Sequence, residues 1–328
     1  MNLTSDLNTR IVYVLVSSSD DIFLEQFWGS LYSLRQFHPN AKVLALTDGP
    51  TARRIKNDKK LAPLYEMISE LMEVDVPDSY INVLRSRDIK TRVRNIIDGD
   101  FFYIDTDTII AAPINGIDTL EVKNIAMVPD LHRQQTTDNI WDVNRVRMVF
   151  NMNITHTNDI YFNAGVVFVR DNATTREFYA KWHENWLTTV KKGYYIDQPG
   201  LFYTDSEFGF IIEKLPDIYN CMGVYSAHYW TEARIIHYLD KGLPLRTLKD
   251  IPKKIHEAQG ITEEVKDLLL NAKKHLSEHT CFCSFYDLAF LNGAFCQFFI
   301  KNGLLYRCVK KFNQWESEWR VRKLNKWK

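Results

Sequence analysis

The sequence has no excess charge of either sign. Lys and Arg together number 41, and Asp and Glu together also number 41, in a chain of 328 residues. Attraction of a polyanion over a distance needs a basic surplus, which this chain does not have. We therefore expect no nucleic-acid partner.

Long apolar runs are missing too. No apolar stretch reaches the ~18 residues that a membrane-spanning helix needs, so we expect no transmembrane segment. The first ten residues, MNLTSDLNTR, are polar and lack the apolar segment of a signal peptide. The chain also has no Gly-x-x-x-x-Gly-Lys-Ser/Thr motif, which excludes a P-loop phosphotransferase. These absences predict a cytoplasmic protein.

Cysteines are few and unevenly placed. Of the five, only Cys221 lies outside a C-terminal group that consists of Cys281, Cys283, Cys296 and Cys308. His275 and His279 lie close to that group, so a zinc site is one alternative. Free buried thiols in a reducing compartment are the favoured alternative.

Apolar residues make up 45% of the chain, enough for a sizeable core. In the first hundred residues, short β-branched runs alternate with amphipathic segments. We expect strands in residues 11–21 (with a loop), 41–49, 71–78 and 101–104, and helices in 22–39, 51–72 and 86–99. This alternation predicts a doubly wound α/β sheet that binds ligands at the carboxyl ends of its strands.

The middle of the chain continues the pattern less regularly. We expect strands in 125–130, 161–170 and 233–244, a helix in 171–186 capped by Asp171 or Asn172, and a short helix entered within 194–202. Residues 131–160 are polar and Asn-rich without a clear period, which predicts a long loop or lid.

The segment FFYIDTDTII, residues 101–110, places two aspartates directly after an apolar strand. Asp105 and Asp107 point the same way if the chain stays extended. Two neighbouring carboxylates repel each other unless a cation lies between them, and hard oxygen ligands suit Mg²⁺ or Mn²⁺. A solvated turn is the alternative. His237, at the end of another strand-like run, is a suitable third ligand.

Four short motifs together resemble a known family. FFYIDTDTII, YFNAGVVFVR, DQPGL and ARIIHYLDKG occur in this order within residues 11–245. They resemble the retaining glycosyltransferases that include glycogenin and the bacterial lipooligosaccharide galactosyltransferases. The resemblance implies a GT-A fold, a Rossmann-like mixed sheet flanked by helices, which binds a nucleotide sugar and a divalent metal.

The resemblance also implies roles for individual residues. The metal ligands would be Asp105, Asp107 and His237, holding Mn²⁺ or Mg²⁺. Asp197 and Gln198 would lie beside the anomeric carbon of the donor sugar. The donor would be bound by Val16, Ser17, Ser18, an aspartate at 20 or 21 (Asp21 is preferred), Arg87, Lys90 (with Arg94 as a further candidate), Asp105, Asn163, Ala164 and Gly165.

Two departures from the family pattern stand out. The family often has Gly-x-x-Lys-Pro-Trp after its histidine, whereas here the lysine, Lys241, is displaced by two positions and no Trp follows. Lys241 is the candidate for the contact to the leaving phosphate. Pro199 and Gly200 follow the Asp-Gln pair, which leaves the sugar specificity open.

The expected activity is transfer of a hexose from a nucleotide diphosphate sugar, a UDP-sugar, to a hydroxyl of a glycan or glycolipid, with retention. A catalytically inactive sugar-nucleotide- or carbohydrate-binding protein is one alternative. A sugar-nucleotide pyrophosphorylase is less favoured, because VSSSDDIF lacks a Gly-rich, basic loop.

The C-terminal part differs in composition. We expect a catalytic domain in residues 1–248 and a helical, aromatic and basic extension in 249–328. The basic end suits peripheral contact with anionic lipid on the inner face of a membrane. A helical bundle packed on the catalytic domain, with a solvated basic end, is the alternative.

Overall fold

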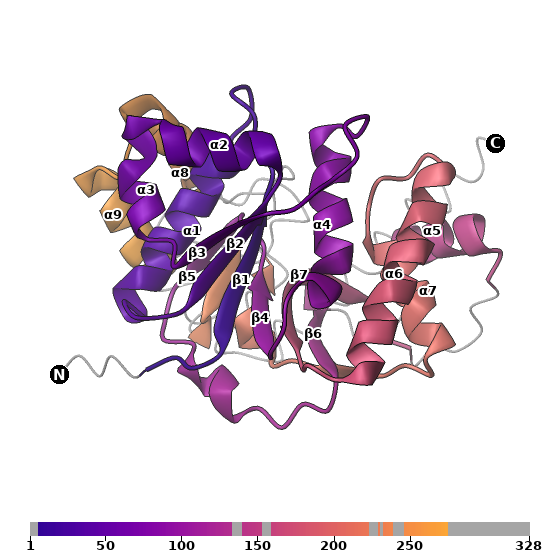
Figure 1. Ribbon diagram of the computed structural model, residues 1–328. Helices are drawn as coiled ribbons and strands as arrows, with labels where there is room; N and C mark the ends of the chain where they lie inside the picture. Colours follow the sequence, from indigo (N-terminus) through magenta and orange to yellow (C-terminus); the bar gives the residue numbers. More distant parts are fainter. Residues whose placement is uncertain are drawn as a thin grey trace, which may run out of the picture.

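A computed structural model describes residues 6–132, 140–152, 159–222, 229, 232–238 and 246–274. Within this part of the chain, the largest sheet has seven strands in the order β3-β2-β1-β4-β7-β6-β8 (Figure 1). The strands are β1 Arg10–Leu15, β2 Val43–Thr47, β3 Glu70–Glu73, β4 Phe101–Ile104, β6 Ile125–Pro129, β7 Phe162–Val169 and β8 Ile212–Lys214.

The direction of the strands brings several chain segments to one edge of this sheet. β3, β2, β1 and β4 are parallel, whereas β7 runs antiparallel to both β4 and β6. β6 therefore runs in the same direction as β4. The carboxyl ends of β1, β2, β4 and β6 meet the amino end of β7 at the same edge, and the predicted mixed sheet is confirmed.

Helices cover both faces of the sheet (Figure 1). The described helices are α1 Phe23–Phe37, α2 Gly49–Asn57, α3 Ala62–Glu66, α4 Asn82–Ile96, α5 Ile140–Phe150, α6 Ala173–Lys191, α7 Gln198–Glu207, α8 Arg246–Ala258 and α9 Glu263–Leu270. β1 shows the two-sided burial, since Ile11 and Tyr13 pack in the core with α1, and Val12 and Val14 pack in the core with α4 and α6. Alternate residues of a strand face opposite sides, so both faces are apolar.

The hydrogen bonds at the N-terminus of α6 show which of the two predicted residues, Asp171 or Asn172, caps the helix. The Asn172 side chain accepts a hydrogen bond from the Thr175 backbone N–H over 2.9 Å, and Thr175 Oγ1 accepts one from the Asn172 N–H over 3.3 Å. Asn172 is therefore the cap.

The prediction of a loop over residues 131–160 is wrong for α5. Val143 and Val146 are buried, and the Phe150 ring stacks on Tyr203 of α7 with a centroid distance of 4.1 Å. These three residues follow helical spacing, but the polar residues between them hide the period. Residues 133–139 and 153–158 lie outside the described part.

Helices α8 and α9 pack against α1 (Figure 1). At Gly29 of α1, an added Cβ would lie 3.5 Å from Ile255 and 3.6 Å from Leu269, so the helices are in close contact there. Ile251 and Ile255 of α8 belong to the same apolar cluster as α1. The described part of the predicted extension thus shares the core of the main sheet, and the boundary at 248 stays a prediction.

Several sequence-predicted features lie outside the described residues. They are Lys241, the four C-terminal cysteines, His275, His279 and the basic tail. Cys221 is described and buried, and its thiol lies 3.6 Å from the Asp217 carbonyl oxygen. Among the described helices, none combines the length and the apolar composition needed to cross a bilayer.

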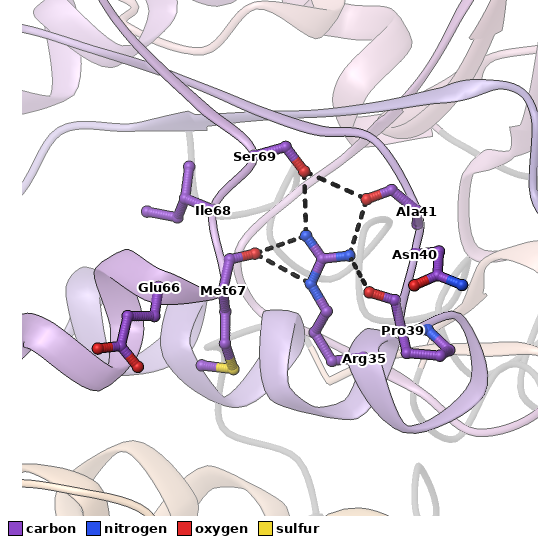
Figure 2. A pocket seen from close by; sticks show the side chains of 8 residues that line it. All are labelled: Arg35, Pro39, Asn40, Ala41, Glu66, Met67, Ile68 and Ser69. Carbon is purple, nitrogen blue, oxygen red and sulfur yellow. Dashed lines mark hydrogen bonds between the residues drawn. The ribbon is translucent and has the colours of Figure 1, made fainter.

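Arg35, near the end of α1, joins the loop before β2 to the loop before β3 (Figure 2). Both loops lie at the amino ends of these strands, away from the carboxyl ends described above. Its Nε and Nη2 donate to the Met67 carbonyl over 2.9 and 2.6 Å, and Nη2 also donates to Ser69 Oγ over 3.2 Å. Its Nη1 donates to the carbonyls of Pro39 and Ala41 over 2.9 and 2.7 Å. All five guanidinium N–H groups are used by the chain itself, so Arg35 has a structural role.

Candidate functional site

Three predicted metal ligands come together beside the carboxyl end of β4. One donor atom from each of Asp105, Asp107 and His237 lies within 4.8 Å of the other two. The two aspartate side chains are 20% and 21% exposed, whereas His237 is 3% exposed. The cluster is thus open to solvent on its carboxylate side.

A second, smaller sheet explains how a residue distant in sequence reaches the aspartates. Within the described residues this sheet contains β5 Thr108–Ile110, β10 Ile235–His237 and β9 Cys221–Met222. β10 pairs antiparallel with β5, which places His237 opposite Thr108. The Tyr238 N–H then donates to the Asp107 carbonyl over 3.1 Å, and this register fixes the histidine beside Asp107.

The His237 ring lies between two polar partners. Its Nε2 is 3.0 Å from Asp107 Oδ1, and its Nδ1 is 3.0 Å from Asn220 Oδ1. Burial lowers the pKa of His237, but Asp107 and Asp105 together outweigh burial and the pKa is raised overall. Burial alone would raise the pKa of Asp107, but His237 holds it below its usual range. The site favours positive charge, and two carboxylates with one imidazole fit a divalent cation such as Mn²⁺ or Mg²⁺.

Gly165 leaves the space that the His237 ring fills. A Cβ added to Gly165 would lie 2.9 Å from His237 Nδ1 and still closer to Cε1. The Gly165 carbonyl also accepts a hydrogen bond from the Asp105 N–H over 2.7 Å. This glycine, predicted to contact the donor sugar, therefore lies against two of the predicted metal ligands.

A buried polar network continues from the histidine to the sheet edge. Asn220 Nδ2 donates to Asn163 Oδ1 over 3.0 Å, and Asn163 Nδ2 donates to Asp130 Oδ1 over 2.9 Å. Gln198, at the start of α7, donates to the same Asp130 oxygen over 3.2 Å. The predicted sugar-binding residues Asn163 and Gln198 are thus linked to the metal cluster. Ala164, which follows Asn163 in β7, is buried.

Two members of this network were not predicted from the sequence. Asp130 follows β6 directly, as Asp105 follows β4, so the same strand-end reasoning could have found it. Asn220 follows the turn Asp217–Tyr219 and is one polar residue in an irregular segment. No sequence pattern distinguishes it.

A second cluster of charges lies on α4 and at the start of α7. Lys90 Nζ is 3.0 Å from Asp105 Oδ1 and 3.4 Å from Asp197 Oδ2. Arg87 Nε is 3.4 Å from Asp197 Oδ1, and the Tyr103 hydroxyl donates to Asp105. Burial would raise the pKa of Asp197, but Lys90 and Arg87 hold it below its usual value. Lys90 thus joins Asp105 to Asp197, and Arg87 makes a second contact with Asp197.

Arg94, the further basic candidate on this helix, does not join the cluster. Its side chain is fully buried near the other end of α4, where it donates to the carbonyls of Gly99 and Ile97. Its Nη2 also lies 3.5 Å from Asp171 Oδ2. Its position one helical turn beyond Lys90 places it at the amino end of β4, away from the Asp pair.

No protein-family model matches the chain, and no curated protein matches its sequence. Among solved structures, the chain is similar to the apo bifunctional glycosyltransferase WbbM, with a TM-score of 0.51, 13% identity, and coverage of 77% of this chain and 52% of that one. It is also similar to the galactosyltransferase LgtC in complex with donor and acceptor sugar analogues, with a TM-score of 0.51, 14% identity, and coverage of 76% and 96%. The chain has the GT-A fold. It spans about half the length of WbbM.

In this GT-A fold, the loop after β1 is braced by Asp21. Its Oδ1 accepts from Ser17 Oγ over 2.7 Å, and its Oδ2 accepts from the Ser18 N–H and Oγ over 2.8 and 2.9 Å. Arg54 of α2 donates to the Ser18 carbonyl over 2.6 Å. Val16 is buried. The Asp21 oxygens thus hold the loop in shape, and direct contact of these residues with a donor stays a prediction.

Proposed function

We propose that this chain is a metal-dependent glycosyltransferase that transfers a hexose from a UDP-sugar to a hydroxyl of a glycan or glycolipid. The observation that carries the proposal is the cluster of Asp105, Asp107 and His237 within 4.8 Å, at the carboxyl end of β4 in a GT-A fold. This edge is where open α/β sheets bind their ligands.

Asp105, Asp107 and His237 would hold Mn²⁺ or Mg²⁺, which supplies positive charge that stabilises a departing diphosphate. Lys90 and Arg87 lie next to this cluster and would add fixed positive charge to the same diphosphate. Both cations contact Asp197, at 3.4 Å each. A donor phosphate would therefore compete with Asp197 for them.

Asp197 and Gln198 would orient the donor sugar at the start of α7. The side chain of Gln198 is held by Asp130 and by the Phe162 carbonyl, each over 3.2 Å. A group held in this way keeps its position when a substrate arrives, which is what precise orientation of an anomeric carbon requires. Lys241 stays a proposed contact to the leaving phosphate.

The donor, the acceptor and the stereochemistry rest on similarity. LgtC, whose fold this chain shares, is a galactosyltransferase solved with donor and acceptor sugar analogues. The motif resemblance implies that the transferred sugar keeps its anomeric configuration. Proton NMR of the first-formed product decides this point, since a retaining enzyme gives the donor's own anomer.

The first experiment is a thermal melt with UDP, GDP or CDP, each with Mn²⁺ and each with EDTA. Binding to the folded state raises the midpoint. We expect a shift with UDP that needs Mn²⁺ and is lost in Asp107→Asn and His237→Gln. A Mn²⁺-dependent shift with GDP or CDP alone would keep the enzyme class and change the donor.

Turnover separates an enzyme from an inactive binding protein. Release of UDP from a panel of UDP-hexoses, with glycan and glycolipid acceptors, should depend on Mn²⁺ in the wild type. Nucleotide binding without release from any donor would instead support the inactive binding protein.

Peripheral membrane contact through the basic C-terminal tail is a separate proposal. It rests on the composition of residues that the structure does not describe. Sedimentation with anionic vesicles at low salt tests it, with neutral vesicles as the control. A protein that stays in the supernatant in both cases contradicts the proposal.

A further inference from the structure

The side chain of Asn220 lies fully buried between the candidate metal site and the sugar-site network. It is 0% exposed. Its Oδ1 lies 3.0 Å from His237 Nδ1, and its Nδ2 donates to Asn163 Oδ1 over 3.0 Å. The oxygen of this amide therefore contacts a predicted metal ligand, and its nitrogen contacts a predicted sugar-binding residue.

The far end of the network fixes the direction of these hydrogen bonds. The Gly165 backbone N–H donates to Asn163 Oδ1 over 2.9 Å, and a backbone N–H can only donate. On its other side, Asn163 Nδ2 donates to a carboxylate oxygen of Asp130. The Asn163 atom that faces Asn220 is thus an oxygen, and the Asn220 atom that faces it is the amide nitrogen.

This direction determines which ring nitrogen of His237 carries hydrogen. Because Asn220 presents Oδ1 to the ring, His237 Nδ1 must be the donor. A neutral imidazole with hydrogen on Nδ1 has its lone pair on Nε2. Nε2 is the atom 3.0 Å from Asp107 Oδ1, so its lone pair points at the carboxylate side of the site.

We propose that Asn220 is a positioning residue that keeps His237 in the Nδ1–H tautomer, with Nε2 available as a metal ligand. The inference rests on the proposed function, because it requires a divalent cation held with Asp105 and Asp107. Metal-binding histidines generally donate their second N–H to an acceptor of this kind, and its loss weakens metal binding by roughly 10–100-fold.

Mn²⁺ affinity tests the proposal without turnover. Mn²⁺ is titrated into the protein, with and without UDP, and free Mn²⁺ is followed by electron paramagnetic resonance. Asn220→Leu keeps the side-chain size but removes the acceptor, so we expect affinity to fall about 10–100-fold. Asn220→Asp still accepts from Nδ1–H, although its second oxygen then faces Asn163 Oδ1, so we expect it to bind Mn²⁺ more tightly than Asn220→Leu and to be less stable than the wild type.

Asn185→Leu is the matched control. Asn185 is a buried asparagine of α6 whose amide donates to Thr204 over 3.0 Å and to Glu207 over 2.8 Å, both on α7. Its replacement also removes two side-chain hydrogen bonds, one buried and one part-buried, but none that leads to His237. We expect it to lower stability and to leave Mn²⁺ affinity unchanged.

The outcomes separate this inference from the proposed function. Wild-type affinity in Asn220→Leu would overturn the positioning role and leave the metal site intact. A wild type that binds no Mn²⁺ under either condition would overturn both. If Asn220→Leu does not fold, ¹⁵N NMR of the Mg²⁺-loaded, histidine-labelled wild type decides, with the His237 signals assigned from His237→Gln. Hydrogen on Nδ1 alone supports the inference, and hydrogen on Nε2 overturns it.

Discussion

Gly165 and His237 lie so close together that no side chain fits between them. A Cβ on Gly165 would be 2.9 Å from His237 Nδ1. The backbone of Gly165 also bonds to Asp105 and to the side chain of Asn163, so it cannot move away without breaking these contacts. A bulkier residue at 165 must therefore displace the imidazole.

We expect Gly165→Ala to weaken Mn²⁺ binding at least tenfold and to lower stability by about 1–3 kcal/mol, because overpacking forces the ring aside. Metal titration and urea unfolding measure the two effects. Gly260→Ala is the control, since an added Cβ there meets nothing within 4 Å. Unchanged Mn²⁺ affinity in Gly165→Ala would contradict the close-contact argument.

Lys90 separates two carboxylates in the candidate site. Its side chain is 4% exposed and lies 3.0 Å from Asp105 and 3.4 Å from Asp197. Lys90→Met leaves the nearly buried Asp197 with Arg87 as its cationic contact, so we expect a loss of roughly 1–3 kcal/mol in the free energy of unfolding. Urea denaturation measures it.

A double mutant checks that the loss in Lys90→Met comes from charge. Adding Asp197→Asn removes the carboxylate that lost its contact with Lys90, so we expect the double mutant to be more stable than the sum of the two single changes. Strict additivity would show that Lys90 and Asp197 do not interact.

Asp205 of α7, which lies outside the candidate site, should make the stability of the folded protein depend on pH. Burial raises its pKa from 3.8 to about 7, and its Oδ1 accepts from the Ile212 N–H over 3.1 Å. Between these two values the folded state binds more protons than the unfolded state. Stability therefore falls as the pH rises from about 4 to about 7, by an amount on the order of a few kcal/mol.

Asp205→Asn should remove this loss, because the amide oxygen keeps the bond to Ile212 and does not ionise. We expect the variant to gain on the wild type at pH 8 and to match it below about pH 4 in thermal or urea unfolding. Asp250→Asn, at an exposed position of α8, is the control. Parallel profiles for Asp205→Asn and the wild type would refute the prediction.

We expect a substitution of Arg35 to lower stability without affecting ligand binding. Lys at this position keeps the charge but cannot reach the carbonyls of Pro39, Ala41 and Met67 together. We expect Arg35→Lys to lose about 2–3 kcal/mol of stability, with unchanged UDP and Mn²⁺ binding. Arg53→Lys is the control, because Arg53 is 66% exposed and its contact with Glu73 is 4.0 Å long. Lost Mn²⁺ binding in Arg35→Lys would contradict the assignment.

The sequence reveals those parts of the fold that have a strong local pattern. β4 is a continuous apolar run ended by two charges, so both the strand and the position of Asp105 and Asp107 can be predicted. α5 cannot, because its apolar stripe is narrow and lies in a polar segment. The mixed direction of the sheet is a property of tertiary pairing and enters only through the family resemblance.

In the candidate site, too, the sequence reveals some residues and not others. His237 stands out because it ends an apolar strand, although the antiparallel pairing with β5 that brings it to Asp107 is not visible in the sequence. Asn220 and the bracing role of Asp21 depend on which groups meet in three dimensions. Tyr103 looks like one more apolar strand residue until its hydroxyl is seen to reach Asp105.

The three successive hydrogen bonds that connect His237 with Asp130 all run in the same direction from donor to acceptor. Each donor points away from the candidate metal site, from His237 to Asn220, then to Asn163, then to the carboxylate of Asp130. An aligned series of this kind is polarised along its length by the negative charge at its end. Electron density is pushed toward Nε2, which makes it the stronger base and the better ligand. The carboxylate that polarises the series thereby lies two amide side chains away from His237, so its negative charge acts on the ring without occupying the candidate metal site.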